Sequence, residues 1–232
     1  MRSDGFLQGV RAVVFDAVGT LLFPDPPAQA VYAEVGRRFG SRLNMDVIAA
    51  RFRAAFRAEE EIDRAAGWRT DEQREERRWQ TIVAATLDDV TDDDGCFGEL
   101  WHHFARPNAW RCDPDAGPVI AELRRRRLAV GIASNFDKRL RTVAAGLPAI
   151  ASVSPLIISS EVGWRKPGRP FFDAVARAVG CAAGDVLHVG DDHENDYIGA
   201  TAAGLRSVLL APSVPAFDPV ARVADLAALL EE

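Results

Sequence analysis

Four short segments of the chain carry polar side chains that could transfer an anionic group. Asp16 follows an apolar run, and Ser134 and Asn135 directly follow a second one. Lys166 lies in a third polar segment, and acidic residues gather at 191–196. A carboxylate can serve as a nucleophile, a hydroxyl and an amide can hold an oxyanion, and a lysine can stabilise its charge. These residue types predict a hydrolytic or group-transfer site if the fold brings them together.

The elements around these segments predict a parallel sheet. Strands are expected at residues 11–16, 128–133, 155–159, 186–189 and 207–210, and helices at 115–127, at 137–145, from 170 to 179, and up to 203. This alternation implies right-handed crossovers and a doubly wound, Rossmann-like α/β core. Such sheets bind ligands beyond the carboxyl ends of their strands. The four polar segments follow strands, so we expect them to converge there.

The stretch from residue 24 to residue 109 has a different pattern. Its apolar residues recur at three- and four-residue spacing, and no strand-like segment interrupts them. This predicts an all-helical cap at 24–109, inserted after the first strand of a core formed by residues 1–23 and 110–232. The tryptophans expected to pack inside this cap or at its hinge are Trp68, Trp79, Trp101 and Trp110.

Composition excludes several classes of protein. The chain has 232 residues, of which 48% are apolar and 27% charged, as in ordinary globular proteins. Its net charge of −6 and the lack of a basic stripe argue against a nucleic-acid partner. No apolar run approaches the roughly 18–20 residues of a membrane helix, and residues 1–10 lack the pattern of a secretory signal. We therefore expect a cytoplasmic protein that binds neither nucleic acid nor a membrane; the sequence leaves its oligomeric state open.

The three cysteines are scattered and show no metal-ligand spacing. They are Cys96, Cys112 and Cys181, an odd number without a CxxC pair. Buried thiols are therefore expected rather than a disulfide or a zinc site.

At its polar segments the chain resembles the haloacid dehalogenase superfamily of hydrolases, with a helical cap of the C1 type. Four motifs carry the resemblance: VVFDAVGTLL at 13–22, IASN at 132–135, RKP at 165–167, and HVGDDHEND at 188–196. Each motif alone is weak, but four in order at the ends of predicted strands are specific. Core and cap together extend the resemblance over nearly the whole chain.

The resemblance implies a role for each residue of the predicted catalytic centre. Asp16 matches the family nucleophile, and Lys166 matches the lysine that stabilises the charge of the transferring group. Ser134 and Asn135 match the residues that hold this group, and Thr20 is expected to assist in binding it. The implied reaction is hydrolysis of a small phosphorylated metabolite through an aspartyl-phosphate on Asp16.

The resemblance also implies a magnesium site. Its ligands would be Asp16, the backbone carbonyl of Val18 and Asp191, while Asp192 or Asp196 would bind the metal or orient its ligands. The residues themselves favour a cation, because the three aspartates at 191–196 would otherwise repel one another and any anionic substrate.

One residue departs from the family pattern. Family phosphatases usually have a second aspartate where this chain has Val18, and that aspartate protonates the leaving group. General acid–base catalysis contributes about 10²–10⁴-fold, so ordinary alkyl phosphates should turn over poorly. A hydrolase of the haloacid dehalogenase or phosphonatase type, which needs no such proton, is therefore a second hypothesis. A third is a catalytically weak protein of this fold that binds a ligand or partner.

Overall fold

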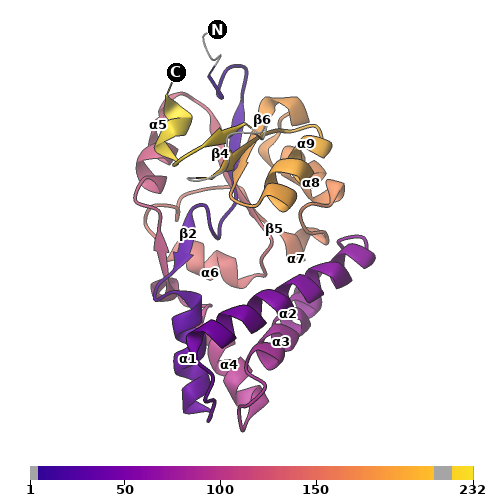
Figure 1. Cartoon of the computed structure of the whole chain (residues 1–232). Helices are drawn as coiled ribbons and strands as arrows, with labels where there is room; N and C mark the ends of the chain where they lie inside the picture. Colours follow the sequence, from indigo (N-terminus) through magenta and orange to yellow (C-terminus); the bar gives the residue numbers. More distant parts are fainter. Residues whose placement is uncertain (1–4, 212–220, 232) are drawn as a thin grey trace.

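A six-stranded parallel sheet lies at the centre of the computed structural model, which describes residues 5–211 and 221–231 (Figure 1). In spatial order the strands are β5 (Leu156–Ile158), β4 (Ala129–Ser134), β1 (Ala12–Phe15), β6 (Val186–Gly190), β7 (Arg206–Leu210) and β8 (Arg222–Val223). Phe15 on β1 pairs with Ile132 on β4 and with Val189 on β6. The residues that follow these strands therefore meet at one edge of the sheet.

Helices cover both faces of this sheet. The main ones are α5 (Ala116–Arg125) and α6 (Arg139–Ala145) on one face, and α8 (Arg169–Val179) and α9 (Gly199–Ala202) on the other. Side chains of β1 alternate between the two layers: Phe15 belongs to the same hydrophobic cluster as Leu123 of α5, and Val14 to the same cluster as Phe172 of α8. Both are buried with no exposed surface. The doubly wound α/β core predicted from strand alternation is confirmed.

Short elements complete the core. They are α7 (Ser159–Val162), the 3₁₀ turns Ala183–Asp185 and Ala227–Leu230, and a π-helical segment at His193–Ile198. The sheet also extends beyond the strand expected to be its last, because Leu209 of β7 pairs with Arg222 of β8. With only two residues, β8 is too short for a hydrophobic pattern to reveal.

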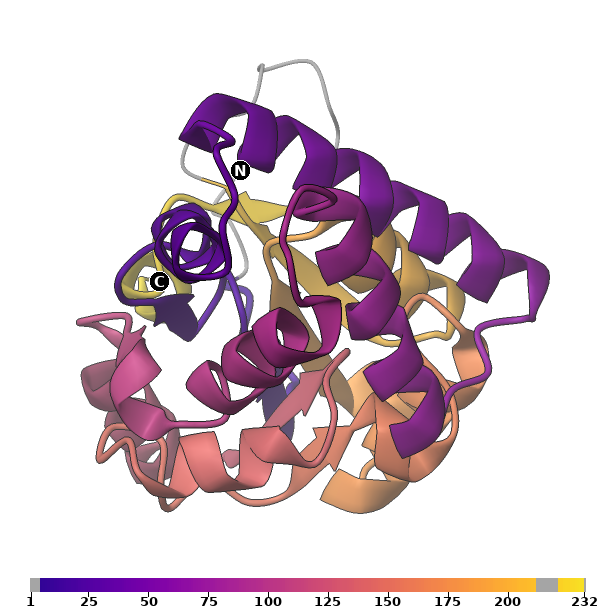
Figure 2. The ribbon, with the colours of Figure 1, turned by 90° about the horizontal axis from the view of Figure 1, so that it is seen from below.

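Four helices lie across the end of the sheet, and we call them the cap helices. They are α1 (Ala28–Arg38), α2 (Met45–Ala65), α3 (Glu72–Thr86) and α4 (Asp93–His103), followed by a 3₁₀ turn at Pro107–Ala109. Viewed from below, they lie in front of the strands (Figure 2). Their apolar faces form a separate cluster that includes Val35, Ile48, Leu87 and Leu100. The cap helices therefore have a hydrophobic core of their own.

The two connections between core and cap helices run side by side. β2 (Leu22–Pro24) leaves the core and pairs antiparallel with β3 (Trp110–Cys112), which returns to it. Sequence periodicity did not show this ribbon, because each strand has three residues and is held by its partner.

The three cysteines are free thiols, with Cys96 buried and the other two half-buried. None of the helices in the described part of the chain has the length and apolarity required to cross a bilayer.

Candidate active site

Asp16, Lys166 and Asp196 form a buried ion cluster at the end of the sheet. Lys166 Nζ lies 2.6 Å from Asp16 Oδ1 and 2.5 Å from Asp196 Oδ1. Burial alone would lower the pKa of Lys166, but the two carboxylates outweigh it and the pKa is raised. Burial raises the pKa of Asp16 against the opposing effect of Lys166. Lys166 and His188 together hold the pKa of Asp196 below its usual range despite its burial. Lys166 is therefore charged and paired next to the predicted nucleophile.

Asp196 is fixed from three directions. Its Oδ1 also contacts His188 Nε2 at 2.9 Å, and its Oδ2 accepts a hydrogen bond from the backbone N–H of Asp192 at 3.1 Å. A Cβ at Gly190 would lie 2.2 Å from the Asp196 carboxylate, so only glycine leaves room for it. The sequence placed Asp196 near a metal; the structure shows that it also positions the Lys166 ammonium.

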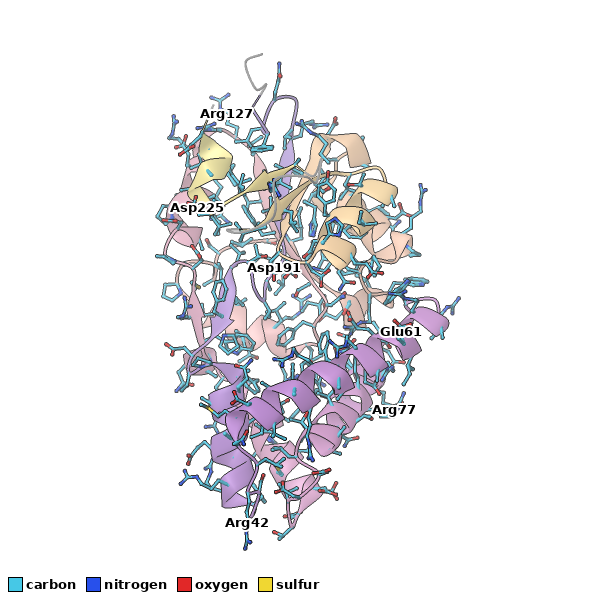
Figure 3. The ribbon with its side chains drawn as sticks, in the orientation of Figure 1. Arg42, Glu61, Arg77, Arg127, Asp191 and Asp225 are labelled. Carbon is cyan, nitrogen blue, oxygen red and sulfur yellow. The ribbon has the colours of Figure 1, made fainter. Side chains whose placement is uncertain are left out.

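The carboxylate of Asp191 completes an acidic group that could hold a metal ion. One oxygen each from Asp16, Asp191 and Asp196 lies within 4.8 Å of the others. Thr20 Oγ1 donates a hydrogen bond of 3.1 Å to Asp191 Oδ1. Gly19, at φ +95°, passes so close that a Cβ there would lie 2.3 Å from Asp191 Oδ2. Figure 3 shows Asp191 at the end of the sheet that faces the cap helices.

Electrostatics at Asp191 favour a cation. Asp191 is exposed toward the cavity. Partial desolvation of its carboxyl group, and then the charges of Asp16 and Asp196, raise the pKa of Asp191 to about 7. Three carboxylates against one lysine leave an excess of two negative charges when all are ionised. Carboxylate oxygens are the ligands that Mg²⁺ prefers. The donor set therefore fits a divalent cation.

The other predicted site residues lie at the same edge of the sheet but differ in their contacts. Ser134 ends β4, is buried, and lines a cavity together with Val18. The Asn135 amide is bound to the backbone of Lys166, with Nδ2 3.0 Å from its carbonyl oxygen and Oδ1 2.8 Å from its nitrogen. Asn135 therefore anchors the loop that carries Lys166. The Asp192 side chain is exposed and accepts hydrogen bonds from the first turn of the π-helical segment.

The cavity between the sheet end and the cap helices has a volume of about 360 Å³. Asp16, Lys166 and Asp191 lie on its core side. Charged side chains, among them Glu75 and Arg139, and nine aromatic side chains contribute to the rest of its wall. The aromatic residues are Tyr32, Phe52, Phe56, Trp79, Phe97, Trp101, Phe104, Trp110 and Phe136. The expectation of packing at the hinge holds for Trp110, which is buried on β3, but Trp79, Trp101 and Trp110 also line the cavity. Helical periodicity marks an apolar face but does not say whether that face meets a core or a cavity.

Arg165, the neighbour of Lys166, joins the core to the cap helices. Its backbone N–H donates to the Trp68 carbonyl at 2.8 Å. Its guanidinium pairs with Glu75 of α3 and lies 3.5 Å from Asp63 of α2. All three charged side chains are buried. The sequence identified Arg165 only as part of a motif and did not predict its ion pairs, because its partners lie far away in the chain.

Comparison with known families matches residues 10–204 to the haloacid dehalogenase-like hydrolases. The chain belongs to this family. The resemblance drawn from the four motifs is thereby confirmed, and the chain is a hydrolase.

Individual members of the family are similar to this chain in sequence or in fold. The chain is 28% identical to the human haloacid dehalogenase-like hydrolase domain-containing protein 3, over 92% of this chain and 86% of that protein. It is 38% identical to a Thermus thermophilus phosphoserine phosphatase, over 49% of this chain and 47% of that one. The solved L-2-haloacid dehalogenase RSc1362 superposes with a TM-score of 0.74 at 22% identity, covering 96% of this chain and 97% of that one. At this identity the superposition shows a shared fold.

Proposed function

We propose that this haloacid dehalogenase-like hydrolase is a Mg²⁺-dependent phosphohydrolase of a small phosphorylated metabolite. The observation that carries the proposal is the group of three carboxylate oxygens, from Asp16, Asp191 and Asp196, within 4.8 Å of one another beside Lys166. A divalent cation neutralises the excess of negative charge, which would otherwise repel a phosphate ester. The phosphoserine phosphatase among its relatives supports the same class of reaction.

Asp16, Asp191 and the Val18 carbonyl would hold the metal, with Asp196 at its side. Bound there, Mg²⁺ supplies positive charge next to the phosphoryl oxygens. The carboxylate of Asp16 attacks phosphorus, the bond to the ester oxygen breaks, and an aspartyl-phosphate forms. Lys166 stabilises the charge that develops on the transferring group, and the Ser134 hydroxyl can donate to it. Water then attacks the same phosphorus and releases phosphate and free Asp16.

Val18 determines which substrates suit this reaction. A valine side chain gives no proton to the departing ester oxygen and takes none from the attacking water. Esters whose leaving groups are stable as anions, such as aryl phosphates, should therefore react faster than alkyl phosphates. Hydrolysis of the aspartyl-phosphate should be slow, giving a burst of product in the first turnover.

The test is the hydrolysis of p-nitrophenyl phosphate with Mg²⁺ and with EDTA. We expect a burst of nitrophenol that requires metal and disappears in Asp16→Asn, which keeps the size of the side chain but removes the nucleophile. Circular dichroism of the variant controls for folding. Equal release in Asp16→Asn, or full release in EDTA, would contradict the proposal.

Val18 also favours a second candidate, a hydrolase of the haloacid dehalogenase or phosphonatase type, whose leaving group needs no protonation. Its test is halide release from 2-haloacids, or aldehyde release from a 2-oxoalkyl phosphonate. Halide release that persists in EDTA would favour a dehalogenase, although the carboxylates of Asp191 and Asp196 would oppose an anionic haloacid. Absence of turnover in all of these assays would favour the ligand-binding alternative.

A further inference from the structure

Arg78 of α3 lies in the wall of the cavity and has no part in the chemistry at Asp16. The residue is 1% exposed. Its Nε donates to Asp63 Oδ2 at 3.0 Å, and its guanidinium carbon lies 4.4 Å from the centre of the Phe56 ring. Its Nη2 is buried and has no hydrogen-bond partner within the described part of the chain. One face of this guanidinium is therefore held by the protein, while a donor on it is unused.

Two other arginines also pair with the acids next to Arg78. Arg165 pairs with Glu75, and Arg74 pairs with Glu59 at 2.7 Å and with Asp63 at 2.7 Å. Burial, and then the charge of Arg165, lower the pKa of Arg78 to about 10, so it stays protonated at neutral pH. A buried charged donor without a partner is costly, and a group entering the cavity would relieve that cost.

The chemistry of the cavity indicates what this group is. The wall that contains Arg78 also contains the aromatic side chains of Phe52, Phe56 and Trp79, together with the acids Glu60 and Glu75. Its aromatic part suits a ligand with a flat, apolar body. The cavity volume of about 360 Å³ lies in the range of small-molecule sites. A hydrogen bond between a guanidinium and a carboxylate is about twice as strong as one between neutral groups. A carboxylate is therefore the partner that suits Arg78 best.

We propose that Arg78 is a specificity-determining residue that binds a carboxylate on the organic part of the substrate. The preferred substrates are then phosphate esters with an aromatic or similarly flat apolar body, and with a carboxylate remote from the phosphoryl group. The phosphoryl group lies at Asp16 and Lys166 on the core side, while the carboxylate lies at α3 on the cap side. Only the placement of the phosphoryl group in this inference rests on the proposed phosphohydrolase function.

Binding of stable analogues tests the assignment without turnover. Benzylphosphonate and its 3- and 4-carboxy derivatives are titrated by calorimetry into the full-length protein with Mg²⁺. For the unmodified protein, we expect one carboxy isomer to bind at least about tenfold more tightly than the parent compound. In Arg78→Gln this preference should fall below twofold, while the parent affinity changes by less than about threefold.

Arg74→Gln is the matched control. Arg74 lies on the same helix and shares the carboxylate partner Asp63, but it does not line the cavity. The carboxylate preference should therefore persist in Arg74→Gln. If Arg78→Gln does not fold, Arg78→Lys keeps the charge without the planar fork and should reduce the preference severalfold. Absence of the preference in the unmodified protein, or its equal loss in both arginine variants, would overturn the proposal.

One further titration separates this inference from the proposed function. 3- and 4-methylbenzoate carry the carboxylate and the ring but no phosphorus. Binding of one of them that weakens at least fivefold in Arg78→Gln would support the carboxylate site even if p-nitrophenyl phosphate is not hydrolysed. Conversely, metal-dependent phosphatase activity without any carboxylate preference would leave the proposed function standing and refute the role of Arg78.

Discussion

The ammonium group of Lys166 lies 2.6 Å from a carboxylate oxygen of Asp16, although 150 positions separate the two residues in the chain. Parallel strands explain this proximity. Asp16 follows the central strand β1, and Asn135, which follows the adjacent strand β4, binds both the N–H and the C=O of Lys166. The sheet thus fixes the backbone of Lys166 through the amide of Asn135, while Asp196 holds its ammonium group.

Replacement of Lys166 should abolish most activity. The chain has one other lysine, Lys138, which is exposed and provides the matched control. We expect Lys166→Met to lower kcat by about 10²–10³-fold, because the charge that stabilises the transferring group is lost. Lys138→Met should change kcat by less than twofold. Steady-state hydrolysis of p-nitrophenyl phosphate measures both, and similar losses in the two variants would refute the assignment.

Introduction of an acid at position 18 should improve the hydrolysis of alkyl esters. Val18→Asp supplies the missing proton donor, so turnover of an alkyl phosphate should rise by about tenfold or more, within the range of general acid–base catalysis. Val18→Asn is the control: asparagine has nearly the same size and polarity as aspartate but transfers no proton, so this variant should give no such gain. If both variants fold and bind Mg²⁺, equal rates would show that the leaving group is protonated by another route.

Gly19 should tolerate no side chain. Both Gly19 and Gly180 have a positive φ, of +95° and +66°, so alanine at either is expected to cost about 1–2 kcal/mol of folding free energy. Only at Gly19 would the new methyl group meet the Asp191 carboxylate; at Gly180 nothing lies within 4 Å. Gly19→Ala should therefore also weaken Mg²⁺ binding by at least about tenfold, a loss not shared by Gly180→Ala. Urea unfolding and magnesium titration would separate the two effects.

The buried pair between Arg165 and Glu75 should couple the core to the cap helices. Removing either partner leaves a buried charge, so each single variant, Arg165→Met or Glu75→Gln, should lose about 3 kcal/mol or more of unfolding free energy. The double variant should lose less than the sum of the two, by about 1–3 kcal/mol. Urea unfolding of the four proteins forms the cycle. Strictly additive losses would show that the pair does not hold the core and the cap helices together.

Local patterns in the sequence were sufficient to predict the fold of the core and the position of many candidate site residues. A short apolar run that ends in Asp16, and the strand–helix alternation after residue 110, imply a parallel sheet whose strand ends meet at one edge. That topology alone brings Asp16, Ser134 and the acids at 191–196 together. The information is local because a buried strand and the residue after it are adjacent in the chain.

Only the tertiary structure decided what surrounds this centre. On α3, Glu75 and Arg78 have the residue types of a solvated helix face, yet both are buried. Glu75 meets Arg165, which lies 90 positions away, and Arg78 contacts the Asp63 carboxylate of another helix. Burial of a charge depends on such distant partners, which periodicity within one helix does not encode. The sequence was therefore sufficient to predict which candidate residues meet at the sheet edge. The aromatic side chains of the cavity wall and the unused donor of Arg78 followed only from the packing of the cap helices against the core.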